Sequence, residues 1–352
     1  MFAIKQLLRG WASPAERAAM IAEDLGLAFG KPCPNKTAED AFLAQVLDSC
    51  GTDVLRLLHH EYDAQFAILS SLPGGRRCYS VLESAVTEIA DTTDTPEVCE
   101  QMLDLFECDW EANHRSPFAS AFYGMLLSNT SLACRGDASD DNLIDPRWIK
   151  YCDYTKQARI VFADNAPAAD QCPFWHRMYY ALGAVDGCRP KELQARFERA
   201  IAFDPGEMDI CMTRMQQLLP GNGGCHASMD AFALDCVTAT RSEMGTAAYA
   251  RLYSHISCWE RLPQTRVNYN LLRQSFFDWQ RKNKSQFVVN AMVSAAADFQ
   301  DFGTIAAMLG NEWTEFHPEA WSSNERAVEG LTELEKRHKP AKVDKPDKVK
   351  AA

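Results

Sequence analysis

Cys225 and His226 are the adjacent residues of this chain whose types most suggest catalysis. They follow two glycines and precede Asp230. A cysteine at a helix N-terminus has a lowered thiol pKa, and glycine lets a substrate approach the backbone closely. Adjacent side chains, however, rarely orient as nucleophile and base. A thiol-dependent hydrolase or transferase using Cys225 and His226 is therefore the alternative hypothesis, and an ordinary helix start capped by Ser228 or His226 explains the same residues.

A second group of potential ligands, His59, His60, Glu61 and Asp63, lies within one predicted helix. His59 and Asp63 are four residues apart and share a helix face, whereas adjacent histidines point about 100° apart. The H-E-x-x-H spacing of helical zinc sites is missing. We interpret these residues as a polar helix face, and we expect neither a metal nor a cofactor.

The glycine-rich loop at residues 221–224 resembles a phosphate-binding loop only in composition. It lacks the Gly-Lys-Ser/Thr that supplies charge and a magnesium ligand, and no strand precedes it. We interpret it as the turn between a helix that ends at Leu218-Leu219-Pro220 and the next helix.

The charge of the chain disfavours nucleic acid as a partner. Its 352 residues include 36 basic and 48 acidic side chains, which gives a net charge of −12. Such a surface repels phosphate backbones and attracts a basic protein. Solubility alone is the simpler explanation of the same acidity.

The cysteines and the N-terminus favour a cytoplasmic protein. Thirteen cysteines are scattered without a C-x-x-C pair or a tight cluster, unlike disulfide scaffolds or zinc modules. Charged side chains interrupt residues 1–29, and no later segment approaches the roughly 20 apolar residues of a membrane span. We expect free thiols in a reducing cytoplasm, with neither a signal peptide nor a membrane span.

Helix signals recur along the chain, whereas strand signals are nearly absent. Apolar residues repeat at helical spacing, for example from Val54 to Leu69. A capping side chain precedes a first-turn proline at Ser13-Pro14, Thr95-Pro96, Ser116-Pro117 and Asp145-Pro146. The sequence predicts an all-α protein of about fifteen helices. Short loops between such helices are typical of an irregular helical-hairpin repeat solenoid.

One helix pair matches the tetratricopeptide pattern. Phe197, Ala200 and Pro205 have the spacing of its second half, and Ala181 occupies the small position of the first helix. Alanine lets two helices pack closely, phenylalanine fills the groove, and proline starts the next helix without losing a needed N–H. We assign these four residues to a structural repeat motif.

Several segments resemble a bacterial family of helical, tetratricopeptide-like proteins that is known only as a domain of unknown function. They are Ser131-Leu-Ala-Cys-Arg135-Gly136, Phe197–Pro205, Leu218-Leu219-Pro220 with Gly223-Gly224, Tyr249-Ala-Arg-Leu-Tyr253, Asn290–Asp301 and Pro318-Glu-Ala-Trp321. The resemblance covers residues 115–325. Relatives tend to place Trp between Leu-Leu-Pro and the double glycine, where this chain has Gly221-Asn222. The resemblance implies the fold and a bacterial origin, and no catalytic residue.

The acidic stretch Asp137–Asp145 is the predicted domain boundary. It separates an N-terminal helical region, residues 1–135, from a C-terminal tetratricopeptide-like repeat region, residues 146–338. The Lys/Pro-rich tail at 339–352 cannot bury an apolar face, so we expect it to be disordered.

Aromatic clusters at helical spacing belong mainly to the core, but Trp175, Tyr179 and Tyr180 are candidates for a partner-binding surface. The leading hypothesis is a non-catalytic protein-binding scaffold with a basic protein partner. An immunity protein or an adaptor for a secreted bacterial toxin or effector fits that description. A module that binds a small regulatory ligand is a third interpretation.

Overall fold

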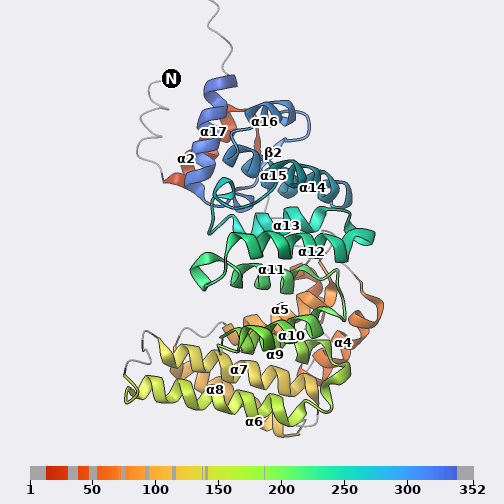
Figure 1. The fold of residues 1–352 in the computed structure, drawn as a ribbon, viewed down its shortest axis with the longest axis vertical. Helices are drawn as coiled ribbons and strands as arrows, with labels where there is room; N and C mark the ends of the chain where they lie inside the picture. The colour runs from red at the N-terminus through yellow and green to blue at the C-terminus, as the bar shows by residue number, and fades with distance from the viewer. Residues whose placement is uncertain are drawn as a thin grey trace, which may run out of the picture. The chain divides into compact units, whose positions relative to one another are not determined.

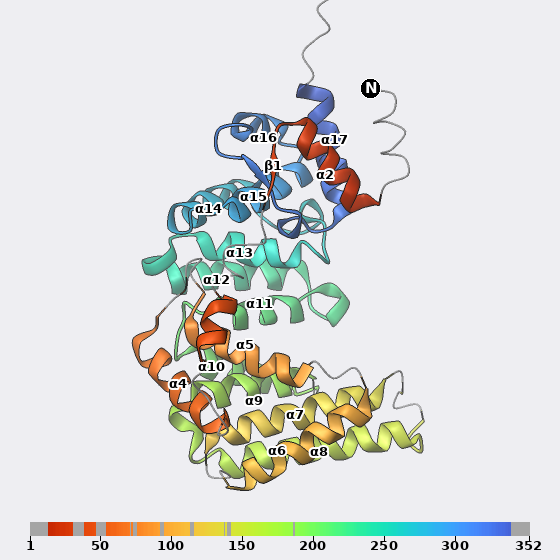
Figure 2. The same cartoon turned by 180° about the vertical axis from the view of Figure 1, so that it is seen from behind.

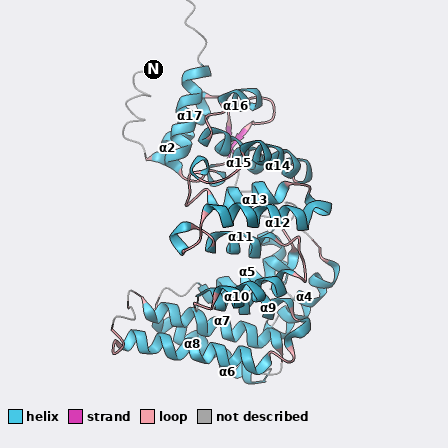
Figure 3. Cartoon of the chain, in the orientation of Figure 1, coloured by secondary structure: helices cyan, strands magenta, loops and turns pink. Residues whose placement is uncertain are grey.

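The protein is almost wholly helical, which confirms the predicted all-α class (Figure 3). The computed structural model describes residues 13–30, 39–46, 54–70, 72, 76–91, 95–112, 116–136, 138, 142–185 and 187–338. The tail predicted to be disordered, 339–352, lies outside these ranges. Over the described ranges, no helix combines the length and the apolar character needed to cross a membrane.

The chain divides into two compact units at a different place from the predicted boundary. Unit 1 comprises Met1–Cys33 and Cys225–Ala352, and unit 2 comprises Pro34–Gly224. Both regions predicted from the sequence therefore contribute residues to both units.

Contacts between the two ends of the chain explain this division. In unit 1, α2 (Pro14–Asp24) packs along α17 (Asn324–His338), as both views show (Figures 1 and 2). Next to them, β1 (Ala28–Phe29) pairs in parallel with β2 (Glu315–Phe316). A strand pair of two residues each leaves no pattern that a sequence could reveal.

In unit 2, a capping residue followed by proline correctly predicted where helices begin. The Ser116 side chain accepts the amide N–H of Ala119 at 3.3 Å, and Asp145 accepts that of Arg147 at 2.9 Å. Proline fits after such caps because the first-turn N–H has no acceptor inside the helix. Besides the helical residues 39–46, the described elements of unit 2 are α4 (Val54–Ile68), α5 (Cys78–Asp91), α6 (Pro96–Ala112), α7 (Pro117–Arg135), α8 (Pro146–Asn165), η1 (Ala169–Gln171), α9 (Pro173–Val185), α10 (Pro190–Ile201), α11 (Met208–Gln217) and η2 (Pro220–Asn222).

Helix α7 lies at the centre of the unit 2 core, packed against α6, α8 and α9. The rings of Phe118 and Phe174 stack with centroids 4.5 Å apart, and Tyr62 lies within 6 Å of both. A Cβ at Gly124 would lie 2.6 Å from the ring of Phe162 on α8, so the close approach of these two helices requires glycine. The aromatic clusters thus belong largely to the core, as predicted.

The helix pair α9–α10 carries the predicted repeat motif. Phe197 and Ala200 are buried, and the Phe197 ring lies 5.5 Å from that of Tyr180. Ala181 is half-buried, whereas Pro205 is exposed in a turn and does not begin α11. The N-cap of α11 is Glu207, whose carboxylate accepts the amides of the first turn.

Unit 1 is completed by helices that follow one another along the chain. Its α13 is buried along most of its length, including Tyr249 and Tyr253, whose hydroxyls both donate to Asp230. The elements of this part are α12 (His226–Met244), α13 (Ala247–Ile256), η3 (Leu262–Gln264), α14 (Tyr269–Lys282), α15 (Gln286–Asp298), α16 (Phe302–Met308) and η4 (Pro318–Ala320).

A single buried amide, Asn290 on α15, organises the polar interior of unit 1. Its Nδ2 donates to the carbonyls of Gln286 and Glu315, both at 2.8 Å. Its Oδ1 accepts the indole N–H of Trp313 at 3.2 Å and the backbone N–H of His317 at 3.1 Å. This fully buried amide therefore uses both donor hydrogens and its acceptor oxygen.

Candidate binding site in unit 2

Buried charged side chains surround Arg177 on α9. Its Nη2 lies 2.6 Å from Glu83 Oε2 and 2.9 Å from Glu207 Oε2, and all three side chains are buried. Tyr62 donates its hydroxyl to Glu83 Oε1 at 2.8 Å. The Nε of Arg177 is buried and has no hydrogen-bond partner among the described residues. Buried charge of this kind is unfavourable unless it is paired, and these contacts supply the pairing.

The turn before α11 supplies one side of the cluster. Buried Asp204 accepts the hydroxyl of Tyr79 at 2.9 Å, the Nε–H of Arg77 at 2.8 Å and the amide of Gly206 at 3.0 Å. Glu207 accepts the amide N–H groups of Asp209 and Ile210 in the first turn of α11. Carboxylates are favourable here because a helix N-terminus carries partial positive charge.

The first residues of α5 and the segment before it supply the other side. Arg76 donates to Asp209 at 3.0 Å and to Glu39 at 2.8 Å. Ser80 donates to the same carboxylate of Asp209 at 2.7 Å. The cluster thus connects α5, α9 and α11 through side chains that are far apart in the sequence.

The proton of Glu83 is held more tightly than that of an ordinary glutamate. The pKa of Glu83 is raised to about 7: burial raises it most, the charges of Glu207 and Asp209 act in the same direction, and Arg177 and the Tyr62 hydroxyl act in the opposite direction. The same burial, together with the charge of Glu83, raises the pKa of Tyr62. Glu83 therefore gains and loses its proton around neutral pH.

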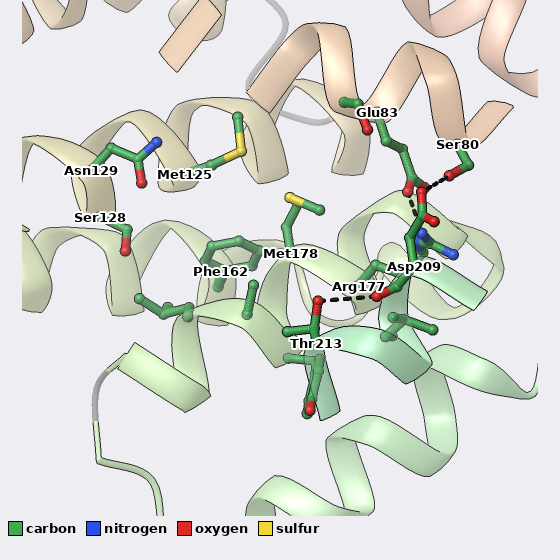
Figure 4. A pocket seen from close by; sticks show the side chains of 15 residues that line it. Ser80, Glu83, Met125, Ser128, Asn129, Phe162, Arg177, Met178, Asp209 and Thr213 are labelled. Carbon is green, nitrogen blue, oxygen red and sulfur yellow. Dashed lines mark hydrogen bonds and ion pairs between the residues drawn. The ribbon is translucent and has the colours of Figure 1, made fainter. Parts of the chain in front are cut away.

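A pocket of about 290 Å³ lies beside this cluster (Figure 4). Glu83, Ser80, Arg177 and Asp209 lie toward one end of the view in Figure 4, and Ser128 and Asn129 lie toward the other. Between them stand the apolar side chains of Met125, Phe162 and Met178. Thr213 on α11 also lines the pocket and is exposed, so the pocket reaches the surface of unit 2 at that residue.

The aromatic residues predicted to form a partner-binding surface occupy a different environment. Trp175 and Tyr180 retain only 3% and 1% of their exposure, so they pack inside unit 2 and do not present a surface. Tyr179 is half-buried beneath the guanidinium of Arg196, which lies 3.6 Å from the ring centroid. These rings shape the fold around the pocket, and among the three only Tyr180 lines it.

Cys225 and His226 lie in unit 1 and interact with different partners. Cys225 is exposed at the N-cap of α12, where hydrogen bonds from Ser228 and from the helix amides lower its pKa. The Sγ atom lies 3.4 Å from Ser228 Oγ. The imidazole of His226 is instead 3.3 Å from the carboxylate of Glu260. The two side chains therefore do not form the nucleophile–base pair that the alternative hypothesis requires.

The other motifs have structural explanations. His59 stacks on Phe118 with ring centroids 4.8 Å apart and lies 3.3 Å from Asp63. No group of three or more potential metal ligands occurs within the described ranges. Gly223 has φ of +85°, and a Cβ on Gly224 would lie 2.1 Å from the carbonyl oxygen of Leu218. The glycine loop therefore serves a tight turn.

The charged residues of the pocket were not singled out from the sequence, although one signal was present; of its lining, the sequence analysis named only Tyr180 and Ala181. Glu83 and Arg177 each interrupt an apolar stretch in a predicted helix, and a lone charge on such a face indicates a buried ion pair. The partner of each could not be deduced, because they come from separate helices.

Comparison of the chain with protein-family models, with curated proteins and with solved structures finds no match. The resemblance to the tetratricopeptide-like bacterial family stays a prediction from the segments that carry it.

Proposed function

We propose that this chain is a non-catalytic binding protein that recognises a protein partner through unit 2. The observation that carries this proposal is the pocket beside the Arg177 cluster, because it combines apolar walls, buried charged groups and an opening at Thr213. In this proposal the helix pairs form an irregular tetratricopeptide-like solenoid, and such solenoids bind peptides and helices along their surfaces.

The chemistry of the chain suggests what kind of protein this is. A net charge of −12 favours a basic partner. Buried free thiols such as Cys78, Cys134 and Cys236 suit a reducing compartment such as the bacterial cytoplasm. An immunity protein or an adaptor for a secreted toxin or effector has these properties, and this is the role that we assign to the chain.

A catalytic role through Cys225 has one supporting observation, the lowered pKa of its thiol. The pairing of His226 with Glu260 leaves that thiol without a neighbouring base. A thiol-dependent hydrolase or transferase is therefore the weaker proposal.

The proposed function is tested by mixing the purified chain with the products of the genes that flank its own. We expect one of them to form a stoichiometric complex, measured by size-exclusion chromatography with light scattering. Thr213→Arg should abolish the complex, because it places bulk and charge at the pocket opening. If none of the flanking products binds, the immunity or adaptor role is contradicted.

A matched control for this substitution exists in unit 1. Thr238 is also exposed on a helix, and like Thr213 its hydroxyl donates to the backbone carbonyl four residues earlier. Thr238→Arg should therefore change charge and helix propensity equally while leaving the complex intact. Loss of the complex in both variants would place the interaction outside the pocket.

A further inference from the structure

We propose that the charged end of the unit 2 pocket receives the cationic head group of a lysine or arginine side chain that belongs to the protein partner. The inference rests on the proposed binding function and names the group that is recognised. Three features support it: the excess of carboxylates over guanidinium groups at this end of the pocket, the apolar walls that lead there, and the protonation of Glu83.

Negative charge exceeds positive charge in the cluster at this end of the pocket. The Arg177 guanidinium is shared by Glu83 and Glu207, so its own charge is already offset. Of the charged side chains that line the pocket, two are carboxylates and one is a guanidinium group: Glu83 and Asp209, with Arg177. The rest of the described cluster adds the carboxylates of Glu39, Asp204 and Glu207 and the guanidinium groups of Arg76 and Arg77. A positive group that enters here meets a favourable potential in a region of low dielectric.

A second pocket, in unit 1, shows that this excess is a property of the unit 2 site. It measures about 330 Å³ and is also rich in charged side chains. Its arginines and carboxylates are equal in number and pair off: Arg326 with Asp298 at 3.7 Å, Arg261 with Glu329 at 3.8 Å, and Arg337 with Glu333 at 2.9 Å. Such a balanced lining gives a cation no preference.

The walls of the unit 2 pocket suit the aliphatic stem of a long basic side chain. Met125, Phe162 and Met178 lie between the charged end and the far end of the pocket (Figure 4). Lysine and arginine bury their methylene stems along apolar surface, and methionine adapts its shape to what it contacts. A volume of about 290 Å³ is at the lower end of the range for small-ligand sites, which suits one side chain.

Glu83 couples this recognition to pH. Its pKa is raised to about 7, mainly by burial, and the charged or titratable groups near it are Tyr62, Tyr79, Cys172, Arg177, Glu207 and Asp209. A cation beside Glu83 favours the ionised carboxylate, so binding releases the proton. Because the free carboxyl is mostly protonated at pH 6 and mostly ionised at pH 8, affinity should rise about tenfold over that interval.

The test uses small probes that differ only in charge. Nα-acetyl-arginine methylamide and Nα-acetyl-lysine methylamide carry the cationic group, whereas the citrulline and Nε-acetyl-lysine counterparts are of similar shape and neutral. We expect the charged probes to bind the full chain in calorimetry at pH 8 and the neutral probes to bind at least tenfold more weakly. Equal binding of charged and neutral probes, or no binding of either, would overturn the proposal.

Butylguanidine distinguishes a partner side chain from a free small cation, since it carries the same single guanidinium charge without the backbone groups. Tighter binding of butylguanidine than of the arginine derivative would point to a small-molecule ligand and would overturn the assignment to a partner. Asp209→Asn should weaken binding of the arginine derivative about tenfold at pH 8. Thr213→Arg should abolish it, and Thr238→Arg should not change it.

The two proposals fail in different ways. If a flanking gene product forms a complex that Thr213→Arg breaks, while no cationic probe binds or competes, then the binding function stands and the cation assignment is wrong. If cationic probes bind at the pocket and no flanking product forms a complex, then the cation site stands and the immunity or adaptor role is wrong.

Discussion

The two units bury different kinds of polar group: a neutral amide in unit 1 and charged side chains in unit 2. In unit 1, Asn290 is fully buried, neutral and hydrogen-bonded through both its nitrogen and its oxygen. In unit 2, Arg177 is buried among carboxylates, one of its nitrogens has no partner among the described residues, and a pocket lies beside it. A satisfied neutral network fixes a core, whereas buried charge beside an opening stabilises poorly and is suited to recognition.

The largest effect is expected where buried carboxylates lose the guanidinium that pairs with them. Arg177→Met removes the guanidinium and leaves Glu83 and Glu207 buried together, so it should lower the free energy of unfolding by about 3–5 kcal/mol in urea denaturation. Arg199→Met, at a half-exposed arginine on α10, is the control and should change it by less than about 1 kcal/mol. An equal, small effect of both substitutions would contradict the contrast between the units.

An ionisable group placed in the neutral Asn290 network should destabilise unit 1. Asn290→Asp loses the two donations to the carbonyls of Gln286 and Glu315 and buries a carboxyl group. We expect a loss of about 2–4 kcal/mol of unfolding free energy. The loss should be larger at pH 8 than at pH 5, because only the ionised carboxylate is charged. A loss independent of pH would mean that the network tolerates charge.

The pH dependence of the free energy of unfolding tests the contribution of Glu83. Its folded pKa of about 7 exceeds the ordinary value of 4.5, so the native state binds this proton more tightly than the unfolded state. The group therefore favours folding most below pH 4.5, and that contribution is lost as pH rises to about 7. Glu83→Gln should remove this slope and raise stability at pH 8 by up to about 3 kcal/mol, measured by denaturation at several pH values. An unchanged slope would assign the pH dependence to other groups.

The smallest effect is expected at the residue that first suggested catalysis. Cys225→Ser replaces an exposed N-cap with a residue that caps helices well, so stability should change by less than about 0.5 kcal/mol in urea denaturation. The complex with the partner should persist in size-exclusion chromatography. Loss of partner binding in this variant would move the functional surface to unit 1.

The residues that could be predicted from the sequence are those whose partners are close in the chain. Ser116 and Asp145 cap their own helices, and Phe197 and Ala200 follow a local spacing, so helix positions and one helix pair were predictable. The Arg177 cluster was not, because its charges come from α5, α9 and α11. The grouping of the two ends of the chain in unit 1 could not be predicted for the same reason, since β1 and β2 lie at opposite ends of the chain.

The most direct test of recognition by buried charge is the number of protons released when a cation binds. Calorimetric titration of the chain with Nα-acetyl-arginine methylamide at pH 7, in two buffers of different ionisation enthalpy, measures this number. With a pKa near 7, Glu83 should release about half a proton for each ligand bound, and Glu83→Gln should release none. Binding without proton release, or release that persists in Glu83→Gln, would contradict the account.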